Sequence, residues 1–193
     1  PLATGVMIVC TGRATKRIEE LQGGEKDYTA EIALGATTPS FDLETEVDAT
    51  YPTAHITRDK VEEVLARFRG TIEQVPPAYS ACKIEGVRAY ELARNGEAVD
   101  LRPKQLRIER LELKSFSPEC ITVDVTCSKG TYIRGLARDI GQALESGAHL
   151  RSLRRTRVGD VTADRCLTAH EVADLIATSP LEFPEDYPYR KDV

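Results

Sequence analysis

Two stretches of strict alternation between apolar and polar residues constrain the fold of this chain more than any other feature. They are Tyr28–Leu34 and Ile121–Cys127. A period of two residues is typical of a β-strand that buries one face. A third run, 106–116, alternates as well, but its phase slips between Ile108 and Leu111. The slip predicts a bulge or a bend in that strand.

Three helices are predicted around these strands. Thr57 can cap a helix whose apolar residues follow helical spacing and which stops at Gly70. A second helix is expected from about Tyr132, with Gly147 as its stop, and the capping box at Thr168–Glu171 predicts a third. Strands and helices are interspersed without a regular βαβ period. This favours an α+β fold with a mixed or largely antiparallel sheet, flanked by helices, over a doubly wound fold.

The composition is that of a globular protein with a real core. The chain has 193 residues, of which 41% are hydrophobic and 30% charged. No apolar run approaches the length of a membrane span, and no secretory leader is visible. The five cysteines and three histidines are widely spaced, which disfavours a disulfide framework and a metal site. We therefore expect a cytoplasmic protein with reduced thiols and no metal.

The charge is distributed unevenly along the chain. The net charge is −5, but residues 129–157 carry seven basic and two acidic side chains, a local net of +5. Residues 160–193 carry three basic and eight acidic side chains, a local net of −5, and 183–193 are predicted to form an acidic surface segment. A local basic surface can bind phosphates whatever the total charge. A solvated face with acidic partners elsewhere is the alternative, and charge alone leaves both open.

The segment Cys127–Gly141 holds the most chemical information. The chain has no P-loop, dinucleotide fingerprint, nucleophile elbow or H-E-x-x-H motif. In this segment a strand ends, a turn follows, and the helix from Tyr132 places Arg134 in its first turn, the unfavourable end of the helix dipole for a cation. Such an arginine is costly to bury unless a carboxylate pairs with it. Asp139 is a poor helical partner, and the sequence indicates no other.

Five blocks of the chain carry a family resemblance. They are PLATG at 1–5, GEKDY at 24–28, PPAYSACK at 76–83 with AYELAR at 89–94, SKGTYIR at 128–134, and GAHLRSLRR at 147–155. In this order they resemble the motifs of the tRNA pseudouridine synthase B (TruB) family. The first block is similar to the second half of that family's G-x-L-D-P-L-A-T-G motif.

The resemblance implies a fold, an activity and a partner. The fold would be that of pseudouridine synthases, with an RNA-binding cleft. The activity would be that of an isomerase that converts uridine 55 in the T-loop of tRNAs to pseudouridine without a cofactor. The partner would be the T-arm stem-loop of tRNA, bound by a monomer.

The resemblance also implies roles for individual residues. The nucleophilic aspartate would stand immediately before Pro1, and Arg134 would pair with it. Tyr28 would stack on the flipped uracil and remove the C5 proton, while Asp42 would support the site. The uridine pocket would be lined by Tyr132 and Leu153, and RNA would be contacted by Lys129, Arg138, Arg151, Arg154 and Arg155. Considered singly, Tyr28, Tyr132, Leu153 and Asp42 are also explained by ordinary packing or capping.

The expected domain is a pseudouridine synthase catalytic domain over 1–193. It would lack the family's amino-terminal part, which includes a G-H-T-G segment, and the carboxyl-terminal PUA domain of many members. The segment 94–103 would be a flexible, exposed insertion that grips RNA. A chain that begins at Pro1 is predicted to be inactive because it supplies no nucleophile. Two other functions stay open, a tRNA-folding chaperone without chemistry and an unrelated α+β ligand-binding protein.

Overall fold

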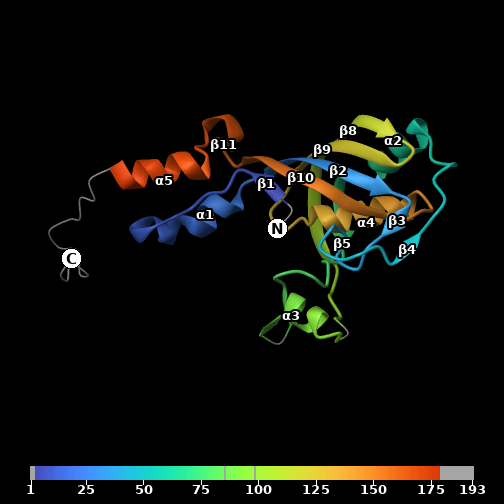
Figure 1. Cartoon of the computed structure of the whole chain (residues 1–193), viewed down its shortest axis with the longest axis horizontal. Coiled ribbons are helices and arrows are strands. Elements are labelled where there is room, and N and C mark those ends of the chain that lie inside the picture. Colours follow the sequence, from blue (N-terminus) through green and yellow to red (C-terminus); the bar gives the residue numbers. More distant parts are fainter. Residues whose placement is uncertain (1–2, 85, 98, 179–193) are drawn as a thin grey trace. The chain divides into compact units, whose positions relative to one another are not determined.

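The computed structural model describes residues 3–84, 86–97 and 99–178 (Figure 1). Contacts divide the chain into a larger unit that ends at Ala163 and a smaller unit that begins at Asp164. The opening proline and the predicted acidic segment 183–193 lie outside the described residues. Within those residues, no helix combines the length and the apolar character needed to cross a membrane.

Seven strands of the described part of the larger unit form one mixed sheet (Figure 1). Their order is β1 (Ala3–Gly5), β10 (Ala148–Val158), β2 (Lys26–Leu34), β9 (Cys120–Cys127), β8 (Lys104–Ser117) and β5 (Gly70–Gln74), with β11 (Val161–Thr162) on β10. β1 runs parallel to β10, and the other neighbouring pairs are antiparallel. The α+β prediction with a mixed, largely antiparallel sheet is confirmed.

The strands lie where alternation predicts them. β2 and β9 contain the two alternating stretches, and their inward residues are buried except for the half-buried Tyr28. In β8 the pairing with β9 shifts between Ile108 and Arg110, so Glu109 is an extra residue. This bulge confirms the predicted phase slip, and it lets Ile108 and Leu111 both face the core.

Two helices, α2 (Arg58–Arg67) and α4 (Ile133–Ala143), pack their apolar faces into one core with the sheet. Thr57 caps α2, because its hydroxyl accepts a hydrogen bond of 3.2 Å from the Lys60 amide. The apolar side chains that the two helices bury follow helical spacing; they are Val61, Val64, Leu65, Ile133, Leu136, Ala137 and Ile140. The burial of these side chains fixes α4, and with it the start of the helix that carries Arg134, against the sheet.

The predicted stop of the second helix at Gly147 is wrong. Helix α4 ends at Ala143, and Glu145 takes the left-handed backbone conformation, with φ of 56°, that ends it. Gly147 is needed for space instead, because a Cβ there would overlap the ring of Tyr51. The glycine signal marked a close contact between loops rather than a helix cap.

The other elements of the larger unit are short. They are η1 (Gly12–Arg17), α1 (Ile18–Gly23), the ribbon of β3 (Ala36–Thr37) and β4 (Ala49–Thr50), the ribbon of β6 (Lys83–Ile84) and β7 (Val87–Arg88), and α3 (Ala89–Arg94). The predicted insertion 94–103 begins at the last residue of α3, and residues 95–97 are exposed as predicted. Residue 98 lies outside the described part of the chain.

η2 (Ala163–Arg165) begins at the last residue of the larger unit, and the smaller unit contains α5 (Ala169–Thr178). The predicted capping box is confirmed. The Thr168 amide donates to the Glu171 carboxylate at 2.7 Å, and the Glu171 amide donates to the Thr168 hydroxyl at 3.2 Å. None of the described residues of α5 is buried, and its apolar side chains Val172, Leu175 and Ile176 are exposed.

Gly5 holds β1 against β10, which gives a stability prediction. Gly5 has φ of 97°, and a Cβ on it would overlap the carbonyl oxygen of Arg155. We expect Gly5→Ala to lower the free energy of unfolding by about 2 kcal/mol or more. Gly23→Ala is the control, because a Cβ there meets nothing within 4 Å. Urea denaturation checks both, and equal stability of the two variants would show that β1 does not need this glycine.

Candidate active site

Arg134 projects from the first turn of α4 to a carboxylate that is distant in the sequence. Its Nη1 lies 3.1 Å from Oδ2 of Asp42, and its Nη2 donates to the Tyr79 carbonyl at 2.8 Å. The Arg134 side chain is 22% exposed and the Asp42 side chain 10%. The predicted need for a carboxylate partner is therefore met by Asp42, which sequence spacing could not identify.

The loop around Asp42 fixes the direction of its carboxylate. Oδ1 accepts hydrogen bonds from the Ser40 hydroxyl at 2.7 Å and from the Glu44 amide at 2.9 Å. Oδ2 is left to face Arg134. The intervening Phe41 has φ of 61°, an uncommon conformation for a bulky residue, which indicates that the loop is held by its surroundings. The loop thus holds the Asp42 carboxylate, and that carboxylate orients the Arg134 guanidinium.

A cavity of about 660 Å³ opens beside this ion pair. Its lining residues are Ala3, Asp42, Leu43, Glu44, Arg94, Arg134, Leu150 and Leu153. Ala3 is the parallel partner of Leu153, so β1 brings the amino-terminal segment to the cavity. The predicted site residues Asp42, Arg134 and Leu153 share this one space, which we call the central cavity.

Tyr132 belongs to an adjoining cavity of about 470 Å³. That cavity shares Glu44, Arg94 and Arg134 with the central cavity. Gln74 holds Tyr132 in place, because its side-chain amide accepts from the Tyr132 N–H at 2.9 Å and donates to the Tyr132 carbonyl at 3.2 Å. Sequence reasoning missed the buried Gln74. The only sign of its role in the sequence was a polar residue at the end of a strand.

Tyr28 lies on β2, two residue pairs along the sheet from Leu153. It pairs with Arg155 of β10, while Leu153 pairs with Ala30. Tyr28 packs against the core and is not among the residues that line the central cavity. Burial raises the pKa of the Tyr28 phenol, and the neighbouring Arg155 guanidinium offsets only part of that rise. The phenol is therefore neutral at pH 7.

The five residues predicted to contact RNA differ in their exposure and in the direction of their side chains. Lys129, Arg151 and Arg154 are exposed, but Arg154 pairs with Thr29 and so points to the opposite face of the sheet from Leu153 and Arg155. Arg138 is only 16% exposed; it bonds Asp139 at 2.7 Å and lies over the Phe41 ring. Of the five, Arg138 is the least suited to contact RNA.

Cys82 is a thiol that the sequence left without a role. Its Sγ lies 3.3 Å from the Tyr132 hydroxyl and 3.8 Å from the Lys104 ammonium. The buried Ser80 hydroxyl lies nearby but has no hydrogen-bond partner among the described residues. Burial opposes ionisation of the thiol, but the hydrogen bond with the Tyr132 hydroxyl and the nearby charge of Lys104 lower the pKa of Cys82.

These surroundings predict that Cys82 reacts fast with iodoacetamide. Burial raises the pKa of Cys127 to about 11, so Cys127 is the internal control. Because only thiolates react, we expect Cys82 to be alkylated about 100-fold faster than Cys127 at pH 7.5. Tyr132→Phe should slow the reaction of Cys82 and leave that of Cys127 unchanged. Peptide mass spectrometry measures both rates, and similar rates for the two thiols would contradict the prediction.

Comparison with known proteins decides the family. Residues 1–133 match the TruB family pseudouridylate synthase (N terminal domain), and residues 134–187 match the tRNA pseudouridylate synthase B C-terminal domain. The chain belongs to the TruB family. Pseudouridine synthases are isomerases, so the predicted family and enzyme class are confirmed.

Individual TruB relatives agree with this assignment. The chain is 61% identical over 186 residues to tRNA pseudouridine synthase B of Parabacteroides distasonis, covering 96% of this chain and 79% of that protein. It is 46% identical over 168 residues to the protein of the same name from Pseudomonas aeruginosa, a match that covers 87% of this chain and 55% of that protein.

A solved structure confirms the fold. A chain in the crystal structure of a Cbf5-Nop10-Gar1 complex superposes with a TM-score of 0.64 at 26% identity. The match covers 90% of this chain and 43% of that one, so this chain spans less than half of the matched protein's length. The predicted pseudouridine synthase fold is confirmed.

Proposed function

We propose that this TruB family member isomerises uridine 55 in the T-loop of tRNA, with its nucleophilic aspartate immediately before Pro1. The observation that carries the proposal is the central cavity, in which the Asp42–Arg134 pair and Leu153 meet the segment that follows Pro1. A cavity of about 660 Å³ is large enough for a nucleoside.

The reaction requires what this cavity offers. Isomerisation breaks the N-glycosidic bond, turns the uracil and rejoins it to the sugar through C5. A uridine within a folded T-loop must first be flipped out and held in a pocket. A carboxylate nucleophile then needs a cation that keeps it ionised and oriented, and Arg134 supplies that charge from a fixed position.

The register of β1 supports the position of the aspartate. The residue before Pro1 stands three positions from Ala3, which lines the central cavity beside Leu153. At a strand rise of about 3.3 Å per residue, the chain brings that residue within roughly 10 Å of Ala3. A polypeptide that begins at Pro1 supplies no carboxylate there, so we expect it to be inactive.

The proposed role of Tyr28 as the base that takes the C5 proton gives a pH prediction. Burial raises the pKa of this phenol, so below that pKa its ionised fraction grows about tenfold per pH unit. The rate of the proton-transfer step in the complete enzyme should therefore rise with pH across the neutral range. Tyr28→Phe should reduce the rate by about 10²- to 10⁴-fold. Single-turnover rates from pH 6 to 9 check this prediction. An unchanged rate in the Tyr28→Phe variant would show that Tyr28 is not the base.

RNA binding in this proposal depends on the exposed cations Lys129 and Arg151 and on the half-buried Arg155. Arginine makes bidentate contacts with phosphates, and the net charge of residues 129–157 is +5. Among the described residues, no group of His, Cys, Asp or Glu side chains could hold a metal ion. The proposal implies a monomer that acts on the T-arm in the cytoplasm.

One experiment separates this function from its alternatives. The complete protein is incubated with a T-arm stem-loop RNA, and nucleosides from the digested RNA are separated by chromatography. Conversion of the T-loop uridine to pseudouridine supports the proposal. Binding without conversion would favour the chaperone. Absence of salt-sensitive RNA binding would favour the unrelated ligand-binding protein.

A further inference from the structure

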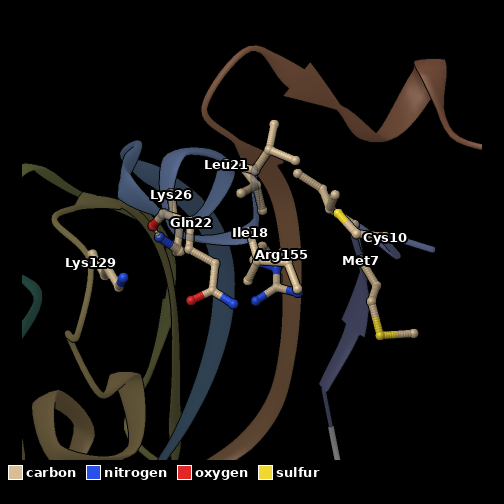
Figure 2. A pocket seen from close by; sticks show the side chains of 10 residues that line it. Met7, Cys10, Ile18, Leu21, Gln22, Lys26, Lys129 and Arg155 are labelled. Atoms are coloured by element: carbon tan, nitrogen blue, oxygen red, sulfur yellow. Dashed lines mark hydrogen bonds between the residues drawn. The ribbon is translucent and has the colours of Figure 1, made fainter. Parts of the chain in front are cut away.

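A separate cavity of about 310 Å³ lies beside β10 (Figure 2), and neither Asp42 nor Arg134 lines it. It is lined by the segment after β1, by α1, by β2 and β10, and by the turn before α4. Its lining residues are Met7, Ile8, Cys10, Ile18, Leu21, Gln22, Lys26, Lys129, Arg155 and Val158. None of these lines the central cavity or the cavity beside Tyr132, so this space, which we call the side pocket, is distinct from both cavities.

Positive charge gathers in the side pocket without a carboxylate to balance it. Lys26, Lys129 and Arg155 line it, and its lining contains no acidic residue (Figure 2). The Lys26 ammonium donates to the carbonyls of Gln22 at 3.0 Å and Gly24 at 2.9 Å, and the Arg155 Nε donates to the Val6 carbonyl at 2.7 Å. These partners are neutral.

The nearest acids are engaged elsewhere. Asp27 and Glu25 both face Arg157, at 2.7 Å and 3.7 Å. Partial burial lowers the pKa of Lys26; Cys127 opposes this shift, and the like charges of Arg155 and Lys129 add to it. An anion in the pocket would relieve this repulsion.

The opposite wall of the side pocket is apolar. Met7, Ile18 and Leu21 come from the segment after β1 and from α1, and Met7 is 74% exposed. Exposed apolar side chains beside a cluster of cations suit a ligand that joins a flat, weakly polar group to a phosphate. A nucleotide has this chemistry.

The side pocket continues the line of the central cavity along β10. Leu153 and Arg155 are successive residues on one face of β10, opposite Ala30 and Tyr28 of β2. Two residues of a strand span about 7 Å, which is comparable with the length of one extended nucleotide. A polynucleotide with a uridine in the central cavity would therefore bring a neighbouring nucleotide to the side pocket.

We infer that the side pocket binds a nucleotide, with its phosphate on Lys26, Lys129 and Arg155 and its base against Met7, Ile18 and Leu21. Two sources share this chemistry, a nucleotide next to the target uridine in RNA and a free mononucleotide. The RNA source rests on the proposed function, whereas the free nucleotide does not.

Cys10 provides a direct test because it lines the side pocket. Its alkylation by iodoacetamide is followed by mass spectrometry in the complete protein, with T-arm RNA, with uridine monophosphate, or with inorganic phosphate. Exposed Cys166, in the smaller unit, is the internal reference. We expect a nucleotide ligand to slow alkylation of Cys10 at least fivefold and to leave Cys166 unchanged. Protection by RNA alone identifies the RNA source, and protection by uridine monophosphate identifies the free nucleotide.

Two variants show whether the cations carry the effect. Lys26→Met and Lys129→Met should each abolish the protection, and Lys129 is exposed on a turn, so its loss does not threaten folding. Lys114→Met is the matched control, because Lys114 is on β8 and faces Asp124. For RNA binding, each pocket variant should reduce the salt dependence by about one charge.

The outcomes for the side pocket and for the proposed function are distinguishable. If RNA binds and is isomerised but Cys10 stays equally reactive with every ligand, the inference is overturned and the proposed function stands. If RNA does not bind, the proposed function fails, and uridine monophosphate alone decides the inference. Protection that survives both lysine substitutions would also overturn it.

Discussion

A form of this protein with an aspartate immediately before Pro1 is expected to make pseudouridine, and replacement of that aspartate by asparagine is expected to abolish the activity. The carboxylate would enter the central cavity beside Leu153 and meet the guanidinium of Arg134. Asparagine has the same shape but cannot act as a nucleophile. We expect a loss of at least about 10⁴-fold, as when other enzymes lose their nucleophile.

The measurement has to distinguish isomers, because uridine and pseudouridine have the same mass. Chromatography of nucleosides from digested T-arm RNA separates the two. The asparagine variant should bind this RNA as tightly as the parent, since the phosphate contacts are unchanged. Pseudouridine formed at the parental rate by the asparagine variant would place the nucleophile elsewhere.

Loss of Arg134 is expected to have the second largest effect. Arg134→Ala should reduce kcat/KM by about 10²- to 10³-fold, the cost of removing one preorganised charged donor from an active site. Arg134→Lys should restore little, because a lysine cannot reach both Asp42 and the Tyr79 carbonyl with a planar fork of donors. Arg134→Ala should also destabilise the fold, because the Asp42 side chain is only 10% exposed and would lose its charged partner.

Arg58→Ala is the matched control for Arg134→Ala. Arg58 pairs with Glu62 at 3.0 Å, as Arg134 pairs with Asp42, but both side chains of that surface pair are more than half exposed. Its loss should change stability by less than about 1 kcal/mol and leave kcat/KM unchanged. Steady-state kinetics and urea denaturation compare the two variants. Equal kinetics would show that Arg134 serves folding alone.

Local patterns predicted the secondary structure well because each depends on residues close in sequence. Alternation located β2 and β9, a slip of phase located the bulge of β8, and hydroxyl caps located the starts of α2 and α5. The failure at Gly147 has the same origin. The contact that requires a glycine there is with Tyr51, which is far away in sequence.

The site could be predicted only in part because its contacts are long-range. The need of Arg134 for a carboxylate follows from local chemistry, but Asp42 lies 92 residues away and meets it only after α4 packs on the sheet. The same limit applies to Gln74, which holds Tyr132 across 58 residues. The face to which Arg154 points depends on the register between β10 and β2, and no local signal in the sequence specifies that register.

The most direct test is to determine which residues of the protein contact the target uridine. A T-arm RNA with 4-thiouridine at the target position is irradiated with the protein, and the cross-linked peptides are identified by mass spectrometry. The account predicts cross-links in the segments that carry Leu153, Tyr132 and Tyr28, around the central cavity. Cross-links confined to distant elements such as α2 would contradict it.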